Sequence, residues 1–147
     1  MAEEVLAVHR FSLSIDKNHW GFFTQCTGLA CSVVLDEFSD GGVNDSLRYL
    51  PKHLTYPPLT LTRPLTADAM RTCEWVQETA RKAQRITMGI ACLDSRGKTV
   101  LQWDLLNAMP VAWRGPILDA GGGGKPMEEV EIIHEGFISG LPGTAKG

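Results

Sequence analysis

The most constraining stretch of this chain lies within residues 85–113. Between Ile86 and Leu93 every second side chain is apolar, which is the period of a β-strand with two distinct faces. The alternation stops at the polar segment 94–98, where Gly97 allows the positive φ of a tight turn. It resumes with Leu101, Trp103 and Leu105 on one face and with Gln102 and Asp104 on the other. The pattern predicts a long β-hairpin, and because isolated hairpins are only marginally stable, further strands must lie beside it.

Shorter alternating or β-branched segments supply these further strands. We expect them at Phe11–Ile15, Trp20–Thr27, Cys31–Phe38, Leu47–Leu50, Leu59–Arg63 and Glu129–Glu135. Pro51 is expected to end the fourth of these segments, and Pro110 to bend or end the second arm of the hairpin. Residues 39–45 are too polar and rich in glycine for regular structure.

One segment has helical rather than strand periodicity. Its predicted apolar stripe follows a cap at Thr66 and consists of Ala69, Cys73, Val76 and Ala80. Asp68 suits the first turn, while Arg81 and Lys82 suit the last turn. The chain therefore predicts a mainly β (α+β) fold: an antiparallel β-barrel or sandwich of seven or eight strands with one flanking helix. We expect a single domain over residues 1–147, with its core at about residues 8–138.

Composition narrows the class of protein. The chain is 44% hydrophobic and 21% charged, as in ordinary globular proteins. Its net charge of −3 argues against a dedicated nucleic-acid binder. No apolar run approaches the ~18 residues of a membrane span. The first residues are acidic and lack the basic and apolar regions of a secretory signal, so we expect folding in a cytosol and no membrane anchor.

The residues that could carry chemistry form no recognisable site. The four cysteines, Cys26, Cys31, Cys73 and Cys92, lack the paired spacing of zinc sites and are interpreted as small buried hydrophobes. The histidines are scattered without acidic partners at motif spacing: His9, His19, His53 and His134. We therefore predict no catalytic residue, no metal ligand and no cofactor.

Two further segments imitate functional motifs. Lys125 follows a glycine run as in a phosphate-binding loop, but Pro126 stands where Ser or Thr would hold magnesium, so a flexible connector is favoured. An acidic cluster could suggest calcium, yet it lacks the required loop spacing: Glu128, Glu129, Glu131 and Glu135. A solvated or lumen-facing acidic surface explains the cluster more simply.

The linear order of the segments resembles the inner tube proteins of contractile tails. The matching pieces are Phe11-x-Leu-x-Ile-Asp16, Trp20-Gly-Phe-Phe, Cys26-Thr-Gly-Leu29, Asp40-Gly-Gly-Val-Asn44, Leu59-Thr-Leu-Thr-Arg63, the helix with Trp75, Leu93-Asp94-x-x-Gly97-Lys98, Asn107-Ala-Met-Pro110-Val-Ala-Trp113 and the closing strand that ends His134-Glu-Gly136. Lys52 and Pro64 replace glycines of the family pattern. The resemblance covers residues 11–137, which is nearly the whole chain.

This resemblance implies a structural subunit and no enzyme. Members of the family assemble as hexameric rings that stack into the hollow inner tube of a phage tail, a tailocin or an extracellular injection system, and type VI secretion tubes are similar. The implied partners are further copies of the chain, a contractile sheath, baseplate or spike and terminator proteins, and a cargo protein or DNA in the lumen. Assembly would occur in the cytoplasm, and the final site would be the particle. The alternatives are a non-catalytic β-sandwich binding module and, third, an enzyme.

The tube interpretation assigns roles to two sets of residues. Residues 36–50 are expected to form an exposed arm that reaches the adjacent ring, with interface candidates Asp36, Asp40, Gly41, Gly42, Asn44 and Arg48. Alternation in the hairpin and the last strand gives the lumen candidates Gln102, Asp104, Glu129, Glu131 and Glu135, although Ile133 shares the face of the glutamates. An acidic bore would repel anionic cargo weakly, so that it slides.

Overall fold

The computed structural model describes residues 7–15, 18–39, 47–67, 69–122 and 124–140. Over these residues the chain forms ten strands and one helix: β1 (Arg10–Ile15), β2 (Asn18–Phe23), β3 (Gln25–Thr27), β4 (Ser32–Ser39), β5 (Leu47–Thr55), β6 (Leu59–Pro64), α1 (Ala69–Arg81), β7 (Ile86–Leu93), β8 (Thr99–Arg114), β9 (Met127–Ile133) and β10 (Phe137–Gly140). Within the described part of the chain no helix has the length and apolarity to cross a membrane.

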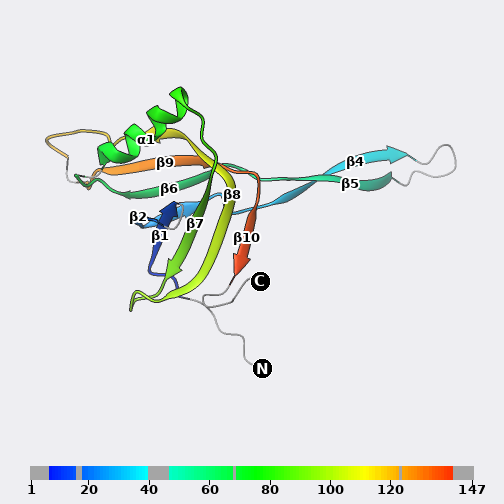
Figure 1. Ribbon diagram of the computed structural model, residues 1–147, viewed down its shortest axis with the longest axis horizontal. Helices are drawn as coiled ribbons and strands as arrows, with labels where there is room; N and C mark the ends of the chain where they lie inside the picture. Colours follow the sequence, from blue (N-terminus) through cyan, green and yellow to red (C-terminus); the bar gives the residue numbers. More distant parts are fainter. Residues whose placement is uncertain (1–6, 16–17, 40–46, 68, 123, 141–147) are drawn as a thin grey trace.

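Eight of the strands form one antiparallel sheet around the predicted hairpin (Figure 1). The sheet order is β2-β1-β7-β8-β9-β6-β3, and β10 pairs with β8. The first half of β8 pairs with β7 and β10, and its second half pairs with β9. A register shift between Pro110 and Ala112 marks the change of partner. The expected irregularity at Pro110 is therefore confirmed, but the strand continues through it to Arg114.

The sheet closes around a single apolar core. Only Thr24 separates β2 from β3, and its N–H donates to the carbonyl of Thr62 at 2.9 Å. The chain itself therefore links the two ends of the sheet order. The side chains that point inward are almost completely buried: Leu13, Phe23, Leu59, Leu61, Met88, Ile90, Leu105, Ala108, Val130 and Ile132. The mainly β fold with one helix is confirmed, although the expected single strand at 20–27 is two strands at opposite ends of the sheet.

Helix α1 lies along one side of this body (Figure 1). Its buried residues are Ala69 and Thr72, and Trp75 packs on Trp20 of β2 with ring centroids 4.6 Å apart. Ala80, which the sequence placed on the apolar stripe, is exposed. The predicted stripe is therefore confirmed at Ala69, Cys73 and Val76, which are buried or partly buried, and wrong at Ala80, while Trp75 from outside the stripe also packs on the barrel. Arg81 occupies the last turn as expected, and Asp68 lies outside the described residues.

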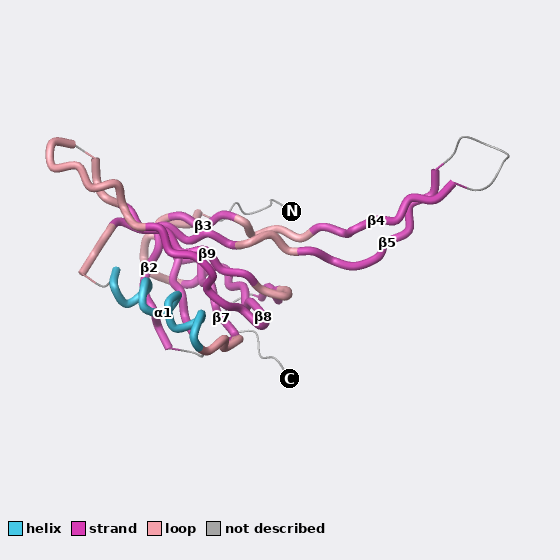
Figure 2. Tube along the Cα trace, turned by 90° about the horizontal axis from the view of Figure 1, so that it is seen from above, coloured by secondary structure: helices cyan, strands magenta, loops and turns pink. Residues whose placement is uncertain are grey.

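Strands β4 and β5 pair only with each other and project from the body as a two-stranded arm (Figure 2). Pro51 was expected to end a short strand after Leu50, but β5 continues to Thr55. A register shift between Val34 and Leu35 falls opposite Pro51. A proline is tolerated there because the outer edge of a two-stranded ribbon needs no ladder donor.

The sequence pattern also did not predict strand β10. This strand has only four residues, and it pairs with β8.

Candidate assembly surfaces

The arm presents an apolar surface that the other described residues do not cover. Cross-strand pairing places Val33 opposite Leu54, Leu35 opposite Pro51, and Ser39 opposite Leu47. Because paired residues share a face, these pairs and the pair of Glu37 with Tyr49 lie on one face of the arm. We call its apolar members the apolar arm face: Val33, Leu35, Leu47, Tyr49, Pro51 and Leu54. Its large side chains are between 49% and 55% exposed. Contiguous apolar surface of this kind marks a site of interaction.

The other face of the arm is mixed in character. Asp36 lies 3.4 Å from the Lys52 ammonium, and both side chains are half exposed. Asp36 pairs with Leu50 and Phe38 pairs with Arg48 on this face. Two interface candidates, Asp36 and Arg48, therefore lie on the arm. The other four, Asp40, Gly41, Gly42 and Asn44, lie outside the described residues.

The structure places the predicted lumen residues Gln102 and Asp104 on the outer face of the β1-β7-β8 part of the sheet. The Gln102 amide donates to Asp104 at 3.1 Å. Gly89 pairs with both Ser14 and Asp104, and a Cβ at Gly89 would lie 2.6 Å from the Ser14 hydroxyl oxygen. Small and polar side chains thus cover this part of the sheet, and the exposed Ile138 of β10, which pairs with Asp104, adjoins them.

The three glutamates proposed for the lumen lie elsewhere and have cationic partners. The Arg114 guanidinium lies 2.9 Å from Glu129 and 3.5 Å from Glu131, and these contacts raise the pKa of Arg114. Arg85 lies 3.6 Å from Glu135, which also accepts a hydrogen bond from the Asn107 amide at 2.6 Å. The structure therefore does not bring the five lumen candidates together, and it does not leave the glutamates as bare negative charge.

The barrel contains a buried ion pair that no local sequence pattern reveals. The Arg63 Nε lies 3.3 Å from the Glu128 carboxylate, and the two side chains are 9% and 1% exposed. The same guanidinium donates to the Thr72 hydroxyl of α1 at 3.1 Å and lies over the Phe23 ring. The interpretation of Glu128 as part of a solvated or lumen-facing acidic surface is wrong, because strand alternation turns it inward with Val130. This pair ties β6, β9 and α1 together.

The cysteines and histidines carry no assembled site in the described part of the chain. Burial, with a smaller contribution from Cys92, raises the pKa of Cys26 to about 12, so this thiol stays protonated and unreactive at neutral pH. Cys31 is exposed, which contradicts its interpretation as a buried hydrophobe. It lies just before β4, where the arm leaves the core. Among the described residues no three His, Cys, Asp or Glu side chains are grouped as metal ligands would be.

His134 is buried at the end of β9, close to the root of the arm. The Gly136 N–H donates to its Nδ1 at 3.3 Å, and its ring centroid lies 5.4 Å from that of Tyr56. Burial lowers the pKa of His134, against the opposing effect of the Gly136 backbone hydrogen bond. The neutral imidazole therefore acts as an aromatic packing group.

A comparison with protein families identifies the chain. Residues 7–138 match the family described as T4-like virus tail tube protein gp19. The chain belongs to this tail tube protein family. It is a structural tube subunit, and the resemblance inferred from the sequence motifs is confirmed. A comparison with curated protein sequences gives no match.

Solved structures share the same fold. A chain of the PVC extracellular contractile injection system, in its extended sheath-tube complex, superposes with a TM-score of 0.80 at 20% identity and covers 95% of this chain and 93% of that chain. A chain of the anti-feeding prophage baseplate gives 0.77 at 18% identity over 98% and 100% of the two chains. Hcp1 from Flavobacterium johnsoniae gives 0.54 at 13% identity over 90% and 95%.

Proposed function

We propose that copies of this chain form hexameric rings which stack into the hollow inner tube of a contractile injection particle, and that contraction of a surrounding sheath drives the tube through a target envelope. The observation that carries the proposal is the apolar arm face, which projects from a closed barrel. In a stacked tube, this face would be buried against a neighbouring subunit. The role is mechanical, and it requires no reaction at any residue.

The physical basis is the difference between an isolated ribbon and a docked ribbon. A two-stranded hairpin is marginal in water, and both strands of the arm have an outer edge that no other described strand pairs. Each apolar side chain of the arm that a neighbour covers stabilises assembly by up to ~1.5–3 kcal/mol. Docking on an adjacent copy would therefore order the arm and hold successive subunits together.

The partners follow from where similar folds occur. Chains of this fold occur in structures of a sheath-tube complex, a baseplate, a tube-terminating cap and a sheath/tube terminator. We infer a sheath around this tube, a baseplate at one end and a terminator at the other. The particle would act outside the cell in which the chain is made, and protein or DNA cargo would pass along the lumen.

For the lumen we propose the outer face that carries Gln102 and Asp104. Its small polar side chains offer few contacts to a passing cargo. Glu129, Glu131 and Glu135 form the competing surface, and their arginine partners lower its net negative charge. Asp104→Lys and Glu131→Lys are a matched pair: the first should slow anionic cargo in assembled tubes, and the second should not. The reverse result would move the bore to the β9 surface.

Assembly is the direct test of the proposed function. Light scattering and negative-stain electron microscopy of the purified protein should show rings or tubes. Deletion of residues 39–45 should leave the circular dichroism of the body intact and abolish stacking. A strictly monomeric wild-type protein at high concentration, with native circular dichroism, would contradict the proposal and favour a binding module.

A further inference from the structure

The segment between β8 and β9 carries the two most exposed large apolar side chains of the described residues. Ile117 is 93% exposed and Leu118 is 83% exposed. They are adjacent in the chain and form what we call the Ile117–Leu118 tip. Singly exposed apolar residues are common on protein surfaces, but two neighbouring side chains almost without intramolecular contact are typical of a surface that is covered in an assembly.

This tip is held in place at its base and by a turn. Arg114, at the end of β8, contacts Glu129 and Glu131 of β9, and the Leu65 N–H donates to the Pro126 carbonyl at 2.9 Å. Asp119 accepts from the backbone N–H groups of Gly121 and Gly122 at 3.1 Å each. The segment therefore presents Ile117 and Leu118 from an anchored position.

Beside the tip is an open cavity of about 530 Å³. Pro116, Ile117 and Met127 supply apolar lining, while Arg114 and Glu129 supply polar groups. A cavity of this composition suits an aromatic side chain with a polar end, since the ring needs apolar contact and the hydroxyl needs a hydrogen-bond partner. Tyr49 of the apolar arm face is such a side chain.

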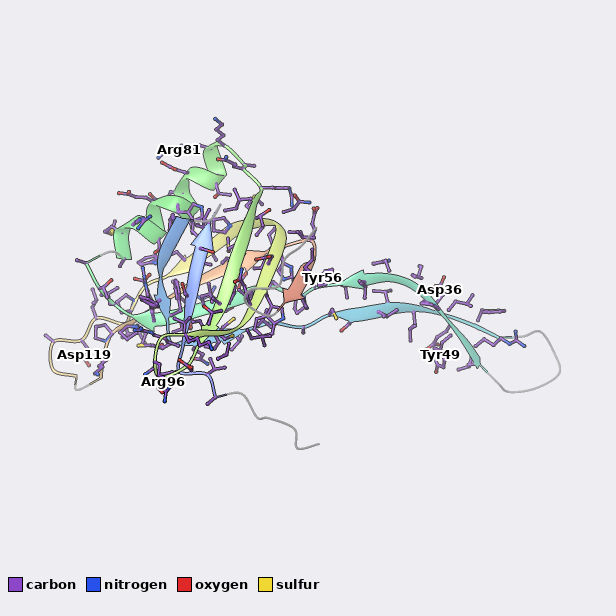
Figure 3. All side chains as sticks on the ribbon, turned by 60° about the horizontal axis from the view of Figure 1, so that its bottom comes forward. Asp36, Tyr49, Tyr56, Arg81, Arg96 and Asp119 are labelled. Atoms are coloured by element: carbon purple, nitrogen blue, oxygen red, sulfur yellow. The ribbon has the colours of Figure 1, made fainter. Side chains whose placement is uncertain are left out.

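The tip and the arm lie at opposite ends of the molecule. The arm extends to one side of the body in Figure 2, and the segment between β8 and β9 extends to the other. Figure 3 labels Asp119 at one end and Tyr49 at the other. The arm of one copy therefore does not cover the tip of the same copy. An open stack requires two different surfaces that fit each other, because a heterologous contact repeats from subunit to subunit.

We propose that the Ile117–Leu118 tip and its cavity receive the apolar arm face of a second copy of this chain. This inference rests on the proposed tube function and adds the receiving surface to it. Each of the two surfaces exposes large apolar side chains that no other described segment covers, and their placement at opposite ends lets one subunit give an arm and accept another. Tyr49 and Leu47 of the incoming arm would contact Ile117 and Leu118.

Site-specific cross-linking tests the contact directly. Cys31 is exposed close to the arm, so the background is Cys31→Ser. The Tyr49→Cys, Leu118→Cys variant should form disulfide-linked oligomers after mild oxidation. On a non-reducing gel they should appear as a ladder of bands at multiples of the subunit mass. A mixture of the two single variants should stop at dimers. The matched control pairs Tyr49→Cys with Ser95→Cys, which lies in the exposed β7–β8 turn and should not form the ladder.

A second measurement does not depend on thiols. Ile117→Asp with Leu118→Asp should raise the critical concentration for assembly by about tenfold or more, as the loss of an apolar anchor from an interface does. Ala120→Asp, exposed in the same segment, is the control and should assemble as the wild type does. Circular dichroism should be native in both, because neither apolar side chain contributes to the core.

The outcomes separate this inference from the proposed function. If the wild type forms tubes but the Tyr49→Cys, Leu118→Cys variant gives no ladder, or gives no more than the Tyr49→Cys, Ser95→Cys control, the inference is overturned and the tube function stands. Normal assembly of the Ile117→Asp, Leu118→Asp variant would also overturn it and indicate that the tip meets another partner, such as the sheath. A wild-type chain that never assembles would overturn both.

Discussion

The body and the arm both contain strands with alternating apolar side chains, but these side chains are buried in the body and exposed in the arm. In β6 of the body, buried and partly exposed residues alternate along the strand, and in β5 of the arm all nine residues are exposed. Both strands alternate apolar and other side chains over part of their length. In the body, the inward set meets the opposite wall of a closed sheet. In the arm, the apolar set is about half exposed and meets no other described element, and the proposed tube covers it with another copy.

The two regions also differ in how they hold polar groups. The body buries Arg63 and Glu128 in contact with each other, and the guanidinium also contacts Thr72 and the Phe23 ring. The second carboxylate oxygen of Glu128 is buried without a hydrogen-bond partner among the described residues. On the arm, Asp36 and Lys52 form a solvent-exposed ion pair, which contributes ~0–1 kcal/mol. The body therefore covers its apolar residues within the chain, whereas the proposed function assigns the covering of the arm to a neighbouring copy. Substitutions in the two regions test this difference through their effects on stability and assembly.

The largest effect is expected at the buried ion pair of the body. Glu128→Gln leaves the Arg63 guanidinium buried without a counter-charge, and we expect a loss of about 3–5 kcal/mol in the free energy of unfolding. Denaturant unfolding of the unassembled protein measures it. The double variant Arg63→Met, Glu128→Leu should recover most of the loss, because a matched apolar pair leaves no charge to solvate. If Glu128→Gln unfolds like the wild type, the pair does not support the body.

A smaller effect is expected at Gly28, where the chain leaves β3 toward the arm. Its φ is +95°, and an added Cβ would collide with the Pro58 carbonyl. Gly28→Ala should therefore lower the free energy of unfolding by about 1–3 kcal/mol and misdirect the arm, so that assembly also weakens. Gly124→Ala is the control, because a Cβ there has no neighbour within 4 Å. If the Gly28→Ala and Gly124→Ala variants are equally stable, the backbone at Gly28 does not require glycine.

The third effect depends on pH and concerns His134 at the root of the arm. Burial lowers its pKa in the folded state, so the unfolded chain binds the proton more readily. The contribution of the neutral ring is complete above the ordinary histidine pKa of 6.5 and is lost as the pH falls through the lower folded value. Thermal unfolding from about pH 7 to about pH 5 should show this loss, and His134→Gln should flatten it. A wild-type slope retained in the variant would assign the effect to other groups.

Local sequence pattern predicted the parts of the fold that depend on local alternation. The hairpin of β7 and β8, the strands β1, β6 and β9, and the helix were all visible as periodicity. The family resemblance, confirmed by the match over residues 7–138, supplied the assembly class. Each of these signals lies in neighbouring residues or in the order of short motifs.

What the pattern missed depends on contacts between distant segments. Arg63 and Glu128 are 65 residues apart, and only the register of β6 on β9 brings them together. Strand β10 exists because β8 offers it an edge, and β5 passes Pro51 because the arm has a free outer edge. Of the interface candidates the described residues show Asp36 and Arg48 on the arm. Alternating apolar residues at 33–35 and 47–51 were a signal for the apolar arm face. The signal was missed because the strand that begins at Leu47 was expected to end at Pro51.

The smallest effect on folding is expected on the apolar arm face, where a substitution should affect assembly far more than the stability of the body. Leu35→Ser combined with Tyr49→Ser removes two side chains that are 50% and 55% exposed, so the free energy of unfolding of the monomer should change by no more than ~0.5 kcal/mol. The same variant should raise the critical concentration for assembly by at least about tenfold, because the proposed contact buries these side chains between copies. Leu105→Ser in the fully buried core is the matched control, with an expected loss of at least ~2 kcal/mol in monomer stability. A variant arm that destabilises the monomer as strongly as Leu105→Ser would mean that the arm folds back on its own body and is no docking element.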